Sequence, residues 1–272
     1  MIDPLLPGPL WLVGCGNMAG AMLARWIEQG VDPVHVSVIR PSGKGAGEGV
    51  RVTVDYPEDE VPAIVLLGMK PYQLDAAAPA LAPILDRETI LVSVLAGVEL
   101  ASLRARFPSP RTIVRAMPNL PVRIGKGVIG LCSDSEDGIA RALATGLMAT
   151  LGHAEWFEDE RSFDLLTALS GSGPAFVYRF IEALAEGAEA LGLGRGRALH
   201  FATATVEGAA ALAQAGGAGL GELAQAVGSP GGTTEAGLAV LDADRALKDL
   251  IARTLDASRR RSLEMAAAAR RD

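Results

Sequence analysis

A short apolar run that leads directly into a glycine-rich turn is the feature that most constrains how this chain can fold. Leu10–Val13 is followed by Gly14-Cys15-Gly16-Asn17-Met18-Ala19-Gly20, and Met18–Gln29 then has the spacing of a helix. The first glycine permits a tight turn, the second leaves no Cβ in front of the backbone, and Ala19 is a third small residue where helix packs on strand. The N–H groups and dipole at the helix start favour an anion. This context predicts a turn that holds the phosphates of a dinucleotide, although the string alone would also suit an ordinary glycine-rich turn.

The rest of the first half continues the alternation of strand and helix. Short aliphatic runs have the composition of strands buried on both faces, and the stretches between them have helical spacing. Such alternation predicts βαβ units and a parallel, doubly wound sheet, with two further strands at its edge. The expected strands are Leu10–Val13, Val34–Ile39, Ala63–Leu67, Ile90–Leu95, Ile113–Ala116, Val128–Leu131 and Ala154–Phe157, and the expected helices are Met18–Gln29, Gln73–Leu85, Leu100–Phe107 and Asp137–Leu151.

The composition changes after about Glu158, and no clear strand is expected from Phe163 onward. We therefore expect two domains: an α/β Rossmann-type domain over residues 1–160 and an all-α domain over residues 161–272. Many small apolar positions on more than one helix face favour an interlocked dimer over a monomeric bundle, and the tail from Arg259 is expected to be a solvated helix end. The expected helices are Pro174–Leu191, Gly196–Gln214, Leu220–Val227, Thr233–Leu241 and Arg245–Ala269.

The overall charge and the cysteine and histidine content narrow the range of partners. Hydrophobic residues make up 49% of the 272 residues and the formal net charge is −7, so neither nucleic acid nor an anionic membrane is expected as the main partner. The two cysteines are far apart and the three histidines have no ligand spacing, which predicts no metal site and a cytoplasmic location. Residues 1–9 lack the basic start of a signal peptide, and no apolar run is long enough to predict a membrane span.

The residues that follow the second expected strand bear on the choice of dinucleotide. An NAD-specific site usually has Asp or Glu at this point, where it binds the ribose 2′-hydroxyl. Here the sequence is Ile39-Arg40-Pro41-Ser42, with Lys44 close behind. A cation and a hydroxyl can bind a 2′-phosphate, so we expect NADP(H) as the preferred cofactor and NAD(H) as the alternative. Arg40 would also suit a solvated loop position.

Two strings rich in glycine, proline and hydroxyl side chains stand before helices in the second half. They are Leu169–Ala175 and Ser229-Pro230-Gly231-Gly232-Thr233-Thr234. Capping by the first serine of the second string, with proline in the first turn, would explain part of it, but not its two glycines and two threonines. Bare N–H groups at a helix start bind anions, so this string is a candidate carboxylate site. No lysine lies between Lys126 and Lys248, so a reaction that needs little acid–base help fits best, such as reduction of a cyclic imine.

With these strings the sequence resembles the Δ1-pyrroline-5-carboxylate reductase family over nearly its whole length. The resemblance implies an N-terminal Rossmann domain, a C-terminal helical dimerisation domain, and homodimers that often assemble further into decamers. It implies NAD(P)H-dependent reduction of Δ1-pyrroline-5-carboxylate to L-proline, the last step of proline synthesis, with hydride passing from nicotinamide C4 to imine carbon C5. The active site would lie between the nicotinamide of one subunit and helices of its partner. The strings that carry the resemblance are Gly14–Ala19, Met69-Lys70-Pro71, Ala96-Gly97-Val98, Arg115–Asn119, Leu169–Ala175 and Ser229–Thr234.

The resemblance also implies roles for individual residues. Thr234 would hydrogen-bond the ring nitrogen of the substrate, and Lys70 is a second candidate catalytic residue, at the carboxyl end of a parallel strand where ligands bind. The carboxylate of the small imine substrate would be held by Ser229, Gly231, Gly232, Thr233 and Thr234. The residues expected to bind the cofactor are Gly14, Gly16, Asn17, Met18, Ala19, Arg40, Ser42, Met69, Lys70, Pro71, Ala96 and Asn119.

Three positions depart from the family's usual pattern. Tyr72, Leu120 and Phe176 stand where the family usually has Gln, Thr and Tyr, and the last two each remove a hydroxyl near the expected cleft. A related cyclic imine carboxylate is therefore the alternative substrate. A β-hydroxyacid dehydrogenase is a more remote alternative, because that family carries a catalytic lysine in its helical domain. A nucleotide-sensing protein would have no need of the Ser229–Thr234 string.

Overall fold

The computed structural model describes residues 6–269 and divides the chain into two compact units. The first unit holds the chain up to Ser172 together with the part from Ser258 onward, and the second holds Gly173–Ala257. The chain thus passes between the units twice, whereas the sequence predicts a single boundary after residue 160. Residues 1–5 of the N-terminal segment and residues 270–272 of the tail, both covered by the expectations above, lie outside the described residues.

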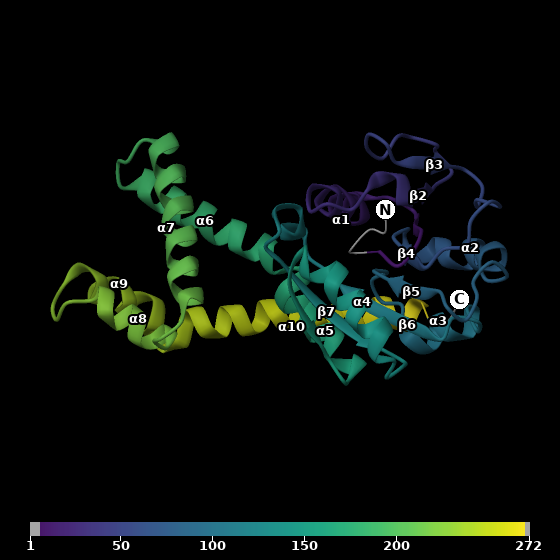
Figure 1. Cartoon of the computed structure of the whole chain (residues 1–272). Coiled ribbons are helices and arrows are strands. Elements are labelled where there is room, and N and C mark those ends of the chain that lie inside the picture. The colour runs from purple at the N-terminus through teal and green to yellow at the C-terminus, as the bar shows by residue number, and fades with distance from the viewer. Residues whose placement is uncertain (1–5, 270–272) are drawn as a thin grey trace. The chain divides into compact units, whose positions relative to one another are not determined.

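The first unit is built on one eight-stranded sheet in the order β3-β2-β1-β4-β5-β6-β7-β8 (Figure 1). The order reverses between β1 and β4, as in a doubly wound sheet. All the expected strands are present, and β3 is an addition that the sequence does not predict, because this three-residue edge strand has no buried run. The strands are β1 (Leu10–Val13), β2 (Val36–Ile39), β3 (Arg51–Thr53), β4 (Ile64–Leu67), β5 (Ile90–Ser93), β6 (Thr112–Met117), β7 (Gly127–Ser133) and β8 (Gly152–Trp156).

One of the two further strands at the sheet edge, whose direction the sequence leaves open, runs against its neighbour. β7 runs antiparallel to β6, while the other neighbouring pairs are parallel. The chain between Met117 and Gly127 forms only a short 3-10 turn, η3 (Leu120–Ile124). A parallel partner needs a crossover of about a dozen residues or more, so this short connection reverses the strand direction.

Helices cover both faces of the sheet and bury its central strands. Every residue of β1, β2 and β4 is buried, as expected of strands covered on both faces. In β1, Leu10 and Leu12 point into a hydrophobic core shared with α1 and α4, and Trp11 and Val13 point into a core shared with α2 and α3. These two cores, rather than helix propensity, hold the turn between β1 and α1 in place. The helices are α1 (Asn17–Glu28), η1 (Pro33–His35), η2 (Pro71–Gln73), α2 (Leu74–Leu81), α3 (Leu100–Arg106) and α4 (Gly138–Ala149).

A partly buried ion pair joins the middle of the sheet to the chain that follows β8. Nη1 of Arg115, on β6, lies 2.7 Å from Oε1 of Glu160, and the guanidinium lies 4.8 Å from the ring centre of Phe163. Glu160 also accepts a hydrogen bond from the N–H of Leu100, at the start of α3. Because both charges have partners, the segment after β8 is fixed against the sheet. Its elements are η4 (Glu160–Ser162), α5 (Phe163–Leu166) and a π-helix, η5 (Thr167–Gly171).

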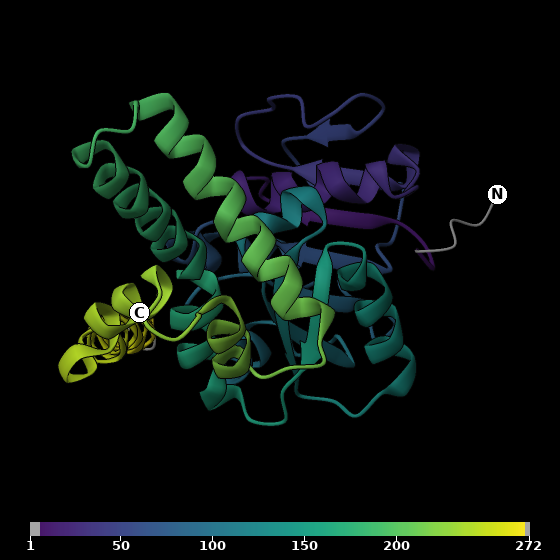
Figure 2. The same ribbon diagram turned by 90° about the vertical axis from the view of Figure 1, so that its left-hand side faces the viewer.

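The second unit is helical, as the sequence predicts. Its helices α6 and α7 lie side by side as a hairpin (Figure 2), packed through the buried Ala185, Ala198 and Ala202. Within residues 6–269, no helix combines the length and the apolar character that a membrane crossing requires. The helices are α6 (Gly173–Ala190), α7 (Arg195–Ala215), α8 (Leu220–Val227), α9 (Thr233–Asp242), η6 (Ala243–Arg245) and α10 (Ala246–Ala269), the last of which continues into the first unit.

The end of α10 belongs to the first unit, and one face of this helix end is packed, whereas Arg259, Arg260 and Arg261 are exposed as expected. Ser258, Ser262 and Ala266 are spaced four residues apart and share one helix face. Oγ of Ser258 lies 3.0 Å from Oγ of Ser172. Ala266 is 4% exposed and lies against Gly97, where an added Cβ would come within 3.3 Å of the Ala266 nitrogen. Small side chains on both sides allow this close approach. The sequence does not predict it, because the arginines of the tail indicate a solvated helix.

Candidate active site

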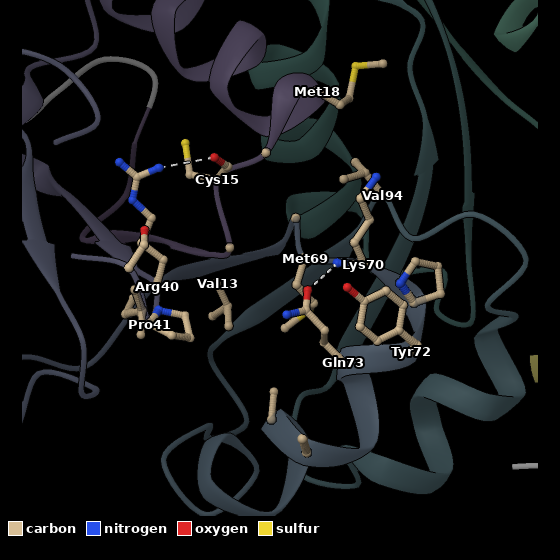
Figure 3. Close-up of a pocket in the computed structure, with 18 of the residues that line it drawn as sticks. Val13, Cys15, Met18, Arg40, Pro41, Met69, Lys70, Tyr72, Gln73 and Val94 are labelled. Carbon is tan, nitrogen blue, oxygen red and sulfur yellow. Dashed lines mark hydrogen bonds between the residues drawn. The ribbon is translucent and has the colours of Figure 1, made fainter. Parts of the chain in front are cut away.

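A cavity of about 870 Å³ opens at the carboxyl ends of the parallel strands, within the first unit (Figure 3). Its walls come from the segments that follow β1 to β6 and from one face of α2. Its size is in the range of ligand sites, and it lies at the edge where doubly wound sheets bind their ligands. The expected cofactor residues that line it are Gly14, Gly16, Asn17, Met18, Arg40, Ser42, Met69, Lys70, Pro71 and Ala96.

The turn after β1 has the backbone that its glycines imply. Gly14 has a φ of +84°, and an added Cβ would lie 2.6 Å from the Met69 nitrogen, so no side chain fits there. At Gly16 an added Cβ would meet nothing within 4 Å, which leaves open space in front of the backbone. Gly16 is the N-cap of α1, which has no side-chain cap and no acidic residue in its first turn. The first N–H groups of α1 are therefore available to an anion.

A second close contact involves Gly68, which the sequence pattern does not single out. Gly68 follows β4 directly, and an added Cβ would lie 2.6 Å from Cβ of Ala19 and 2.9 Å from the carbonyl oxygen of Gly14. Ala19 is 1% exposed and does not line the cavity. Its small side chain serves the packing of α1 on the sheet, which is the reason for a small residue at this position.

Arg40 follows β2 and reaches back to the turn after β1 (Figure 3). Its Nη1 donates to the carbonyl oxygen of Cys15 at 3.3 Å, and its Nη2 donates to the carbonyl oxygen of Gly45. The guanidinium thus ties two loops together while its charge stays at the cavity wall, which Ser42 also lines. Burial raises the pKa of the Cys15 thiol, and the nearby charge of Arg40 lowers this pKa by less. The thiol therefore stays protonated near pH 7 and is a poor nucleophile.

The segment after β4 forms the opposite wall. Lys70 and Gln73 exchange two hydrogen bonds of 2.9 Å, from the Lys70 N–H to Oε1 of Gln73 and from the Gln73 N–H to the Lys70 carbonyl oxygen. This closes η2 and keeps the exposed Lys70 at the cavity. Tyr72 is 83% exposed and stands at the same wall (Figure 3). Alanines of α2, which sequence alone cannot distinguish from ordinary helix packing, complete the wall: Ala76, Ala77 and Ala80.

Asn119, expected among the cofactor ligands, does not line the cavity. It is 5% exposed, and its side chain bonds to the protein backbone at both ends. Its neighbour Leu120 is 46% exposed and lines the cavity instead. The chain after β6 therefore reaches the cavity as the sequence predicts, but the side chain that lines the cavity is Leu120 and not Asn119.

The Ser229–Thr234 string lies in the second unit and leads into α9. The N-cap of α9 is Gly232, and no side chain caps it. Capping by Ser229 is thus not the reason for this string. The Gly232 N–H donates instead to the Ser229 carbonyl oxygen at 2.8 Å, which closes a tight turn before the helix.

Gly231 and the two threonines define which N–H groups this helix start presents to a ligand. Gly231 has a φ of +71°, and its N–H donates to a carboxylate oxygen of Glu235 in the first turn of α9. The N–H groups of Thr233 and Thr234 lie in that first turn, where no intrahelical acceptor exists. These two N–H groups, together with the half-buried Thr234 side chain, are what the string presents to a ligand.

The residues of the first unit fit the phosphates of a dinucleotide. The α1 start is bare, the backbone at Gly16 faces open space, and the Arg40 guanidinium adds positive charge. No group of three or more His, Cys, Asp or Glu side chains within residues 6–269 could hold a metal ion.

Substitution of Gly68 by alanine should weaken NADPH binding, because the added methyl group would press on Ala19 and Gly14 and displace the start of α1. We expect the NADPH dissociation constant, measured by calorimetry, to rise by about tenfold. Gly146→Ala is the matched control, because an added Cβ in the middle of α4 meets nothing within 4 Å. Equal NADPH affinity of the two variants would show that this contact does not position the turn.

Family models match both halves of the chain. Residues 160–265 match a model described as pyrroline-5-carboxylate reductase dimerisation, and residues 10–97 match one described as NADP oxidoreductase, coenzyme F420-dependent.

Known relatives extend the match over almost the whole chain. The chain is 35% identical over 264 residues to pyrroline-5-carboxylate reductase of Pseudomonas aeruginosa, covering 93% of this chain and 95% of that one. The enzyme of the same name from Synechocystis is 36% identical over 266 residues, with 94% and 97% covered. The structure of a pyrroline-5-carboxylate reductase from Coxiella burnetii matches with a TM-score of 0.87 at 32% identity, covering 95% and 98%. That of Plasmodium falciparum pyrroline carboxylate reductase, with NADP bound, shares the fold with a TM-score of 0.85 at 24% identity, covering 96% and 98%. On this similarity, which spans almost the full length of both partners, the chain belongs to the pyrroline-5-carboxylate reductase family of oxidoreductases.

Proposed function

We propose that this protein reduces Δ1-pyrroline-5-carboxylate to L-proline, with NADPH as the preferred hydride donor and NADH as the alternative. The observation that carries the proposal is the bare start of α1, which opens onto a large cavity at the carboxyl ends of the parallel strands. The relatives named for this imine supply the substrate class.

The first unit holds the cofactor through backbone and charge. The N–H groups from Gly16 to Met18 bind the pyrophosphate. Arg40 and Ser42 stand where an NAD-specific site would have an acid, so they favour a 2′-phosphate. Lys70 brings an ammonium group to the wall of the cavity, where it attracts anionic ligands. When bound, the cofactor supplies the hydride, which no side chain can provide.

The second unit holds the substrate with few groups. A protonated imine already carries the positive charge that attracts a hydride, so the protein need only bind and orient it. We assign the carboxylate to the N–H groups of Thr233 and Thr234, with Ser229, Gly231 and Gly232 shaping the turn before them. The hydroxyl of Thr234 holds the ring nitrogen and its proton.

A related cyclic imine carboxylate is the second candidate substrate. The observation that favours it is Leu120, whose apolar side chain lines the cavity where the family usually has a hydroxyl. A less polar wall would accept a ring with more carbon surface.

We further propose a cytoplasmic homodimer, able to assemble into a decamer. Both cysteines are free thiols, as is usual in a reducing compartment. The second unit leaves large apolar side chains exposed, and such surfaces mark sites of association. They include Tyr178, Phe180, Leu191, Leu199, Phe201, Leu212, Val227, Val240, Leu250 and Ile251.

Size-exclusion chromatography with light scattering should give a mass of at least twice that of one chain, because this apolar surface is costly to leave in water. Dilution of the sample tests whether the assembly is tight. A single monomer mass at all concentrations would rule out the dimer.

Steady-state assays at 340 nm should show NADPH oxidation that depends on Δ1-pyrroline-5-carboxylate, with a higher kcat/KM for NADPH than for NADH. A six-membered cyclic imine carboxylate is the comparison substrate, and a 3-hydroxyacid with NADP⁺ is the control for dehydrogenase activity. A higher kcat/KM for NADH would overturn the cofactor assignment, and turnover of the 3-hydroxyacid alone would overturn the reaction class.

Replacement of Thr234 by alanine should lower kcat/KM by about 10- to 100-fold, since one hydrogen bond to the transition state is lost. Thr203→Ala is the matched control, because the Thr203 hydroxyl donates to the Leu199 carbonyl within its own helix. If Thr234→Ala retains the activity of the unmodified enzyme, Thr234 has no part in the mechanism.

A further inference from the structure

The buried side-chain amide of Asn119 connects three segments of the first unit. Its Nδ2 donates to the carbonyl oxygen of Ser170 at 2.9 Å, and its Oδ1 accepts from the N–H of Val128 at 2.9 Å. Ser170 lies in the π-helix η5, and Val128 lies in β7. Since one partner is a carbonyl and the other an N–H group, only one orientation of the amide satisfies both.

The Ser170 carbonyl has a particular need for this donor. In an α-helix its partner would be the N–H of the residue four positions on, but that residue is Pro174, which has no N–H. The chain there forms a π-turn, in which the N–H of Ser172 donates to the Thr167 carbonyl oxygen at 2.9 Å. Ser170 is 9% exposed, so water has little access to its carbonyl. Asn119 supplies the donor that the proline removes.

The same amide also anchors the wall of the cofactor cavity. Asn119 is the N-cap of η3, and the next residue, Leu120, lines the cavity. On the other side, Met117 packs close to the π-helix, since a Cβ added at Gly171 would lie 3.1 Å from its methyl carbon. The chain from Met117 to Leu120 is thus held between the π-helix and β7.

We propose that Asn119 is a positioning residue, which sets the cavity wall at Leu120 and the π-helix before α6 without contacting the cofactor. Only the kinetic test of this inference rests on the proposed imine reduction. The pyrophosphate turn from Gly14 to Met18 lies on another segment, so loss of Asn119 should leave cofactor affinity nearly intact. Turnover should fall instead, because it requires the reacting groups to be held in place.

Asn119→Asp separates the two hydrogen bonds. Its carboxylate still accepts from the Val128 N–H but repels the Ser170 carbonyl oxygen, whereas the protonated acid can donate to that oxygen. At pH 8 we expect kcat about tenfold below the unmodified enzyme, with the NADPH dissociation constant changed by less than about threefold. As the pH falls toward 5.5, the ratio of the two kcat values should approach one.

The thermal midpoint of the cofactor-free protein gives a readout that does not depend on turnover. Because the native state favours the protonated acid, its stability deficit is largest at high pH and shrinks as the pH falls. The midpoint of Asn119→Asp should therefore approach that of the unmodified protein at low pH. Asn119→Ala loses both hydrogen bonds without adding a charge. The decrease in its thermal midpoint and the decrease in its kcat should therefore not depend on pH.

Thr145→Val is the control for loss of stability alone. It removes the acceptor of the Trp156 Nε1 hydrogen bond, 2.8 Å long and formed between α4 and β8. Its thermal midpoint should fall while kcat stays unchanged. If Asn119→Asp does not fold, Asn119→Ala decides: a tenfold lower kcat with unchanged NADPH affinity supports the proposal.

Three results would overturn the proposal. They are unmodified turnover in either Asn119 variant at pH 8, a pH-independent deficit in Asn119→Asp, or a tenfold loss of NADPH affinity with unchanged kcat. The last result would make Asn119 a cofactor ligand. If the unmodified enzyme itself does not reduce the imine, the proposed function fails, and the thermal midpoints still test the role of Asn119.

Discussion

The contact between the turn after β1 and the end of β4 is the constraint on which the cofactor site depends. Gly14, Gly68 and Ala19 meet here at distances that leave no room for a larger side chain. The strands beneath are buried on both faces and cannot shift to make room, because protein interiors are close-packed. The start of α1 is therefore held at the cavity, with N–H groups that no side chain caps. The proposed phosphate site at this helix start therefore depends on packing more than on charged side chains.

Three buried polar side chains of the first unit bond to partners on distant segments. Trp26 donates to the Leu147 carbonyl and so joins α1 to α4. Arg115 pairs with Glu160, and Asn119 serves the Ser170 carbonyl. An unsatisfied buried group costs about 1–3 kcal/mol, so each pair resists separation of the segments that it joins. The walls of the cavity are in this way coupled to the chain that leads into the helical unit.

The sequence predicts most of the strands and helices of the first unit, together with the edge of the sheet where ligands bind. Hydrophobic periodicity and glycine turns are local signals, which can be read from residues that are neighbours in the chain. Strands that are apolar on both faces must be covered on both faces, so their place in the middle of the sheet could also be predicted. The contacts that involve distant residues were not predictable in this way. Nothing in the sequence distinguishes Gly68 from other glycines that follow strands, and its role is visible only in its contact with Ala19. The sequence likewise predicts that Asn119 lines the cavity, whereas in the structure its side chain bonds to the Ser170 carbonyl.

By itself, the sequence determined the glycine-rich turn at Gly14–Ala19, the alternation of strands and helices, and the helix start at Thr233–Thr234, because each depends on residues that are neighbours in the chain. Only the tertiary structure decided the direction of β7, the packing of Ala266 on Gly97, and the inward orientation of Asn119. Each of these depends on segments that are far apart in sequence. Their positions are set when buried backbone groups must find partners and small side chains must fill the space between elements.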